Sequence, residues 1–166
     1  LGELLYIMMQ GTGIGYSVED HIVAKWPKVV DGRNEFNEKR KTWIVEDSTE
    51  GWVDAYKHGI STWMDGFDVE FDFSRIRPSG AILKTKGGYA SGPEPFRDLL
   101  NFTREIILGA QGRQLTPFEV HRLATKAGSI VMVGGVRRAA QISLSSAEND
   151  EMKNCKQGNF WLQYPE

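Results

Sequence analysis

Short strand-like segments alternate with long amphipathic segments along this sequence, and this alternation limits the fold more than any other feature. Residues 69–73 alternate apolar and polar side chains with a period of two, which is typical of a strand with one buried face. Residues 96–110 and 120–130 repeat their apolar positions every three or four residues, as helices that bury one face do. Helices interleaved with strands predict an α/β fold.

Capping residues set the boundaries of the predicted elements. The clearest start combines Thr116 as N-cap, Pro117 in the first turn and Glu119 as capping-box partner. Ser48 is the predicted cap of an earlier helix, and Ser146 that of the last one. The predicted order is helix 1–10, strand 14–18, mostly loop 19–41, strand 42–45, helix 48–66, strand 69–73, glycine-rich loop 78–93, helix 95–112, helix 116–133, strand 141–144 and a final helix.

Composition narrows the class of protein. The chain has 166 residues, of which 40% are hydrophobic and 25% charged, as in an ordinary globular domain. It has no apolar run near the roughly 18–20 residues that cross a bilayer, so no membrane partner is predicted. The net charge of −2 does not indicate a nucleic-acid partner. The single cysteine, Cys155, excludes an internal disulfide and fits a cytoplasmic location.

Metal and nucleophile chemistry find little support in the sequence. His21, His58 and His121 are far apart and have no Cys or His partner at ligand spacing, so no metal site is predicted. Cys155 lies in a polar segment between Asn154 and Lys156, and we do not predict a catalytic role for it.

Residues 11–15 read GTGIG and superficially resemble a dinucleotide-binding fingerprint. That fingerprint requires a strand before the glycines and a helix after them, whereas the predicted order here is the reverse. A Rossmann site is therefore not predicted. A tight turn into a strand and a backbone contact with a nucleotide both remain open.

Two further segments combine glycines with cations. In the first, Arg77, Lys84 and Lys86 stand near the paired glycines Gly87 and Gly88. A flexible backbone beside Arg and Lys is suited to holding a phosphate, and the alternative is a solvated basic loop.

The second such segment contains Gly134, Gly135 and Arg137 between an apolar helix and a strand. Arginine can bind phosphate or contact a nucleotide base, and the alternative is a turn with surface arginines.

The order of these segments is more specific than any one of them. The similarity covers essentially the whole chain and rests on residues 11–19, 47–52, 73–81, 87–95 and 134–140. In this order they resemble the adenosylcobalamin-dependent ribonucleoside-triphosphate reductases, of the monomeric type. The blocks Arg-Pro-x-Gly, Ala-Ser-Gly-Pro and Gly-Gly-Val-Arg-Arg are specific in combination.

The resemblance implies an architecture. That family has a ten-stranded α/β barrel with a radical-bearing finger loop inside. Residues 1–18 and 69–166 would then form part of one barrel half with its specificity loops. Residues 19–68 resemble the insertion that forms the effector site in monomeric members and is lacking in dimeric ones.

The resemblance also implies roles for individual residues. Arg77 and Lys86 match positions that hold effector phosphates, within or next to a first specificity loop of residues 84–92. Gly13 matches a backbone position beside the substrate sugar, and Arg137 matches a contact to the substrate base. The remaining residues implied in effector binding are Lys84, Gly87, Gly88, Gly134 and Gly135.

The implied activity is conversion of ribonucleotides to 2′-deoxyribonucleotides by a radical mechanism. It would use adenosylcobalamin as cofactor, a deoxynucleotide as effector and an external dithiol such as thioredoxin as reductant. The thiyl-radical cysteine, its neighbouring carboxylate and the reducing cysteine pair of that family have no counterpart here. We therefore expect an internal segment of a longer reductase that is inactive alone. The rivals are a stand-alone, non-catalytic nucleotide-binding module and a split enzyme completed by separate chains.

Overall fold

The computed structural model describes residues 1–32, 41–83, 87–132 and 139–165, and it confirms the predicted α/β class. The strands are β1 (Ile14–Ser17), β2 (Lys41–Ile44), β3 (Val69–Asp72) and β4 (Gln141–Leu144). The helices are α1 (Gly2–Met9), α2 (Asp20–Val23), α3 (Thr49–Met64), α4 (Glu94–Gly109), α5 (Pro117–Met132), α6 (Asp150–Asn154) and α7 (Phe160–Gln163). Within the described residues, no helix is long and apolar enough to cross a membrane.

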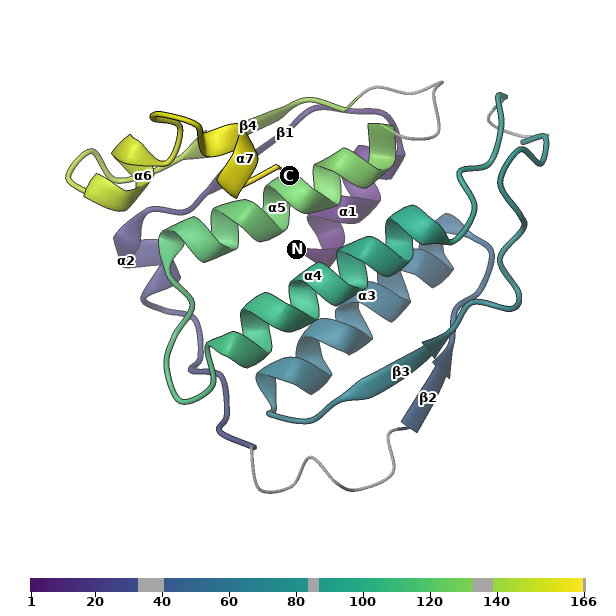
Figure 1. Cartoon of the computed structure of the whole chain (residues 1–166), viewed down its shortest axis with the longest axis horizontal. Coiled ribbons are helices and arrows are strands. Elements are labelled where there is room, and N and C mark those ends of the chain that lie inside the picture. Colours follow the sequence, from purple (N-terminus) through teal and green to yellow (C-terminus); the bar gives the residue numbers. More distant parts are fainter. Residues whose placement is uncertain (33–40, 84–86, 133–138, 166) are drawn as a thin grey trace.

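The strands form two parallel pairs (Figure 1). In one pair β1 lies beside β4, with Ile14 opposite Gln141. In the other β2 lies beside β3, with Lys41 opposite Val69. Parallel neighbours need a long crossover between them, and α3 supplies it for the second pair. Parallel pairing also brings the carboxyl ends of β2 and β3 to the same edge.

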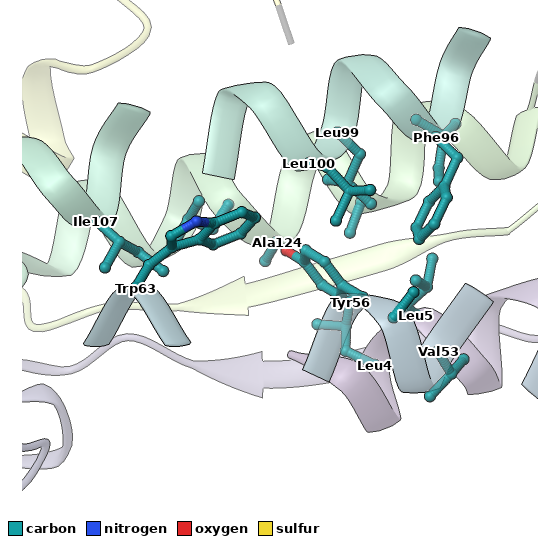
Figure 2. Packing of buried hydrophobic residues seen from close by; sticks show 14 of the residues in the cluster. Leu4, Leu5, Val53, Tyr56, Trp63, Phe96, Leu99, Leu100, Ile107 and Ala124 are labelled. Atoms are coloured by element: carbon teal, nitrogen blue, oxygen red, sulfur yellow. The ribbon is translucent and has the colours of Figure 1, made fainter. Parts of the chain in front are cut away.

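The hydrophobic core lies between α1, α3, α4 and α5. Tyr56 and Trp63 of α3 are almost fully buried and face Leu99 and Ile107 of α4, with Leu5 of α1 nearby (Figure 2). Each such side chain contributes roughly 1.5–3 kcal/mol by leaving water. The Tyr56 ring of α3 lies between α1 and α4 (Figure 2). Inside the core, Thr103 Oγ1 donates a hydrogen bond to the Tyr56 hydroxyl at 3.3 Å. Burial raises the pKa of Tyr56, so it stays neutral.

The predicted starts of α3 and α5 are confirmed. Ser48 Oγ accepts a hydrogen bond from the Gly51 N–H at 2.9 Å. At α5 the Glu119 N–H donates to Thr116 Oγ1 at 3.1 Å, and the Thr116 N–H donates back to the Glu119 carboxylate at 2.8 Å. Arg113 adds two hydrogen bonds to the same carboxylate, at 2.7 and 2.8 Å. Although burial opposes it, Arg113 holds the pKa of Glu119 below its ordinary value.

A buried carboxylate fixes the start of β3 to α4. Asp68, whose side chain is 3% exposed, accepts two hydrogen bonds from Arg104 at 2.8 and 2.6 Å. It also accepts from Trp63 Nε1 at 3.2 Å and from the Val69 N–H at 3.0 Å. Burial alone would raise the pKa of Asp68, but the hydrogen bonds and charge of Arg104 bring it below its ordinary value. The ion pair therefore joins the residue that precedes β3 to the second half of α4.

The last helices differ from the prediction. Ser146 does not cap a helix, and that prediction was wrong: its Oγ accepts from the Asp20 N–H at 2.9 Å and so holds α2. Asn149 caps α6 instead, accepting from the Met152 N–H at 2.9 Å. The short helices α2 and α7 were not predicted, since each is four residues long and too short for periodicity to show.

Candidate functional site

Four charged side chains meet where β2 and β3 end. Glu46 and Asp47 follow β2, while Arg75 and Arg77 follow β3. Arg77 Nε donates to Asp47 Oδ2 at 2.6 Å, and Arg75 pairs with Glu46. Ligands of open parallel sheets commonly bind outside the carboxyl ends of the strands. This edge is therefore the first candidate site.

Asp47 orients Arg77 without enclosing it. The side chains of Arg77 and Asp47 are 40% and 30% exposed, so the pair lies at the surface and adds little stability by itself. A guanidinium is planar and carries five N–H donors. The hydrogen bond from Nε to Asp47 fixes the plane of the group and therefore the direction in which its two terminal nitrogens can donate. The neighbouring Ile76 is buried, and its N–H donates to Phe73 O at 2.9 Å. A buried residue thus anchors the two arginines that flank it.

The predicted glycine-rich loop turns back on itself through a single antiparallel bridge, and we call this part of the chain the hairpin. Ile82 and Tyr89 form an antiparallel bridge. The Gly80 N–H donates to Ala90 O, and the Leu83 N–H donates to Gly88 O, both at 2.9 Å. The hairpin begins directly after Arg77 and runs into α4 (Figure 1). Lys84 and Lys86, which the resemblance places at the effector, lie outside the described residues.

Glycines permit the turns of this hairpin. Gly87 and Gly88 have φ values of +73° and +79°, in the left-handed region where other residues are strained. Gly92 has φ +76°, and a Cβ there would lie 2.9 Å from the backbone nitrogen of Ser79. Gly92 therefore serves both the turn and the close approach of the two hairpin ends.

Exposed apolar side chains stand on the same hairpin. Ile82 is 72% exposed and Tyr89 is 65% exposed, and they lie opposite each other across the bridge. A nucleotide presents an anion and a flat apolar base. Arg77 at the base of the hairpin and the Ile82–Tyr89 pair above it offer partners for both.

The second candidate site is at the start of β1 and β4. The order of α1, glycine turn and β1 confirms the reasoning against a Rossmann fingerprint. The Ile14 N–H donates to Ala140 O at 2.9 Å. Gly13 lies next to this bond, since a Cβ atom added to Gly13 would be 3.7 Å from Ala140 O. Gly13 thus lies beside the residue that ends the 134–140 segment. Gly134, Gly135 and Arg137 fall outside the described residues.

Histidine and cysteine are dispersed rather than gathered. Among the described residues no group of three His, Cys, Asp or Glu side chains could hold a metal. His58 stacks on Trp43 with ring centroids 4.1 Å apart, and burial lowers its pKa. Cys155 is half-buried at the end of α6, where its Sγ donates to Met152 O at 3.0 Å.

Sequence reasoning missed the acidic partners of the arginines. Asp47 stands 30 residues before Arg77, and no local pattern links the two. Only the parallel pairing of β2 with β3 brings them together. The one available signal was that both residues lie within five residues of the end of a strand-like segment.

No protein-family model matches the chain. The chain is 31% identical over 160 residues to the adenosylcobalamin-dependent ribonucleoside-triphosphate reductase of Euglena gracilis, a match covering 94% of this chain and 21% of that protein. The reductases of the same name from Lactobacillus gasseri and Lactobacillus leichmannii are each 29% identical, over 90% of this chain and 25% of theirs. The chain thus spans about a fifth to a quarter of the length of these relatives.

A solved structure has the same fold. It is the crystal structure of a B-12 dependent (class II) ribonucleotide reductase, which superposes with a TM-score of 0.83 at 24% sequence identity. The superposition covers 98% of this chain and 26% of the other.

Proposed function

This chain is homologous to a segment of the adenosylcobalamin-dependent ribonucleoside-triphosphate reductases, and we propose that it carries part of the nucleotide-recognition surface of such an enzyme. The enzyme as a whole would replace the ribose 2′-hydroxyl of a ribonucleotide by hydrogen through a radical mechanism. An external dithiol such as thioredoxin would supply the electrons. The sequence match over nearly the whole chain supports this proposal.

Adenosylcobalamin would supply the radical when bound to the complete enzyme. The described residues do not fit it. His58 is stacked on Trp43, and His121 borders a cavity of about 590 Å³, which suits a drug-sized ligand rather than a corrin. We assign none of the described residues to this cofactor.

The effector site that we propose lies at the carboxyl ends of β2 and β3. Arg77 would bind the phosphates of a deoxynucleotide, held in place by its 2.6 Å hydrogen bond to Asp47. Lys84 and Lys86 would add charge, and Gly87 and Gly88 would let the hairpin backbone approach the ligand. The oriented guanidinium at a strand-end edge is the observation that carries this assignment.

The substrate site that we propose lies at the other pair of strands. Gly13 would face the sugar, and the 134–140 segment, with Gly134, Gly135 and Arg137, would relay effector identity to the substrate base. The hydrogen bond between Ile14 and Ala140 supports this, because it joins the two glycine segments at one end of the β1–β4 pair.

The exposed face of β4 supports placement in a larger barrel. Ile142 and Leu144 are 67% and 56% exposed, although parallel strands are normally covered on both faces. Further strands and a finger loop of a ten-stranded barrel would cover them. Residues 19–68, which supply β2 and α3 to the candidate effector site, would be the insertion of the monomeric members.

Effector titrations of the full-length reductase test the assignment. Arg77→Gln should raise the half-saturating concentration of every deoxynucleoside triphosphate by about ten- to a hundredfold, because phosphate is common to all and one charge-assisted hydrogen bond is lost. The double variant Arg77→Gln with Lys86→Gln should bind every effector more weakly still. At saturating effector it should keep the base preference of the unsubstituted enzyme. Arg75→Gln is the matched control, since Arg75 pairs with Glu46 at the same edge. Equal effects of the Arg75 and Arg77 variants would refute the specific role of Arg77.

A stand-alone nucleotide-binding module remains the second candidate. Such a module would bind nucleotides with the same surfaces but reduce none of them.

A further inference from the structure

Gly51, in the first turn of α3, lies where a side chain would not fit. A Cβ added to Gly51 would be 2.5 Å from Glu46 O and 2.7 Å from Glu46 Cβ. Folded proteins essentially never bring a Cβ within 3.0 Å of such atoms, so alanine at this position would force a shift. Gly51 belongs to the block of residues 47–52, of which the proposed effector site uses Asp47 alone.

Neither the helix nor its cap requires a glycine at this position. Gly51 lies within α3, where alanine is the more favourable residue. Its N–H donates to Ser48 Oγ at 2.9 Å, and any residue except proline could supply that donor. The close approach of Glu46 therefore accounts for the glycine.

The core holds the helix side of this contact in place. Trp52 stacks on the buried Phe96 of α4, with ring centroids 4.7 Å apart. Val53 is buried as well, and Figure 2 shows Val53 and Phe96 among the core side chains. Because protein interiors are close-packed, the first turn of α3 cannot easily move away from Glu46.

The strand side is held just as firmly. Val45, which directly follows β2, is fully buried, and its N–H donates to Asp72 O at 2.9 Å. Glu46 and Asp47 form the short link between Val45 and the start of α3, and their side chains are 56% and 30% exposed. A methyl group on residue 51 would therefore displace this link and not the segments on either side of it.

This link carries the carboxylate that orients Arg77. Glu46 O, the atom nearest to the added Cβ, also accepts from the Ser48 N–H at 2.9 Å, so its displacement would move Asp47, which lies between them. Asp47 Oδ2 is 2.6 Å from Arg77 Nε. A functional side chain must be held to within about 0.5 Å, and the steric shift at Gly51 is of that order.

We infer that Gly51 is a positioning residue of the effector site. It leaves room for Glu46 O, which sets the place of Asp47, and Asp47 in turn sets the direction of the Arg77 guanidinium. Gly51 itself touches no ligand. The inference rests on the effector site proposed above and adds to it the start of α3.

Effector titrations of the full-length reductase with Gly51→Ala test this role. The half-saturating concentration of every deoxynucleoside triphosphate should rise about three- to tenfold, the worth of one ordinary hydrogen bond, because the guanidinium is misplaced and not removed. Turnover at saturating effector should be unchanged. Gly109→Ala is the matched control, the same substitution in a helix with open space around its Cβ position, and it should leave half-saturation unchanged.

A double-mutant cycle with Arg77→Gln separates positioning from general damage. If Gly51 acts through Arg77, adding Gly51→Ala to Arg77→Gln should weaken effector binding no further. Gly51→Ala should also stay folded, because the strain falls on a surface link. Unfolding of Gly51→Ala, unchanged half-saturation, or a full additional loss in the Arg77→Gln background would overturn the inference and leave the effector site standing. Unchanged effector affinity in Arg77→Gln itself would remove the effector site, and this inference with it.

Discussion

Replacing Asp68 by asparagine should destabilise the folded chain more than replacing the acidic partner of an exposed ion pair, such as Asp150, by its amide. Asp68 accepts four hydrogen bonds and is 3% exposed. Asparagine keeps the shape, but it removes the charge and must turn either its amide donors or a single oxygen toward Arg104. The guanidinium then loses a bidentate partner in a partly buried position.

The magnitude follows from burial. Removing one partner of a fully buried pair costs about 3–5 kcal/mol. Arg104 is 34% exposed, so water compensates part of its loss, and we expect about 2–3 kcal/mol. This corresponds to roughly a 30- to 150-fold change in the folding equilibrium. Asp150→Asn is the matched control, because the Asp150 and Lys153 side chains are 84% and 50% exposed and such pairs contribute about 0–1 kcal/mol.

Urea unfolding at pH 7 measures both variants. The pKa of Asp68 is lowered in the folded chain, so its stabilising contribution is present above the ordinary pKa of 3.8 and is lost as the pH falls through the lower folded value. The difference between the unsubstituted chain and Asp68→Asn should therefore narrow below about pH 4. A loss no larger than that of Asp150→Asn, or a difference that is constant down to pH 2, would show that Asp68 does not act through its charge.

Three other changes test separate features. Gly92→Ala should lower the free energy of unfolding by more than about 1 kcal/mol in thermal unfolding, because φ is +76° and the new Cβ would lie 2.9 Å from Ser79 N. Gly109→Ala is the control and should cost less, because Gly109 lies in a helix with open space around its Cβ position. Ser48→Ala should cost about 1 kcal/mol through loss of the α3 cap, and restoration by Ser48→Asp would identify the cap as the cause. In the full-length reductase, Arg137→Ala should slow turnover of some bases roughly ten- to a hundredfold more than others, and a uniform loss over four substrates would point to a phosphate role instead.

Local chemistry was sufficient to predict most elements of this fold. The capping box at Thr116 and Glu119, the Ser48 cap and the period-two pattern of 69–73 each act within a few residues, and each is observed. Ser146 failed as a predicted cap because its hydroxyl bonds to a segment 126 residues away. A preference for capping cannot reveal such a competing partner.

The candidate site was predictable in composition but not in geometry. Arg77 and the glycines of the hairpin were recognised from residue type. The segment 78–93 was predicted as a glycine-rich loop, and its described residues form a single isolated bridge, between Ile82 and Tyr89. Asp47 and Arg77 are 30 residues apart, and they meet because β2 and β3 lie in parallel, so their pairing required the tertiary structure.

Deoxynucleotide formation by the full-length protein is the most direct test of the central proposal. We predict that ribonucleoside triphosphates or diphosphates are converted to deoxynucleotides only when adenosylcobalamin and a dithiol are both present, and that added deoxynucleotides change which base is reduced. The 166-residue chain alone should form no deoxynucleotide above a protein-free blank, because it has one cysteine. A full-length protein that binds nucleotides but forms no deoxynucleotide under these conditions would contradict the reductase proposal and favour a binding module.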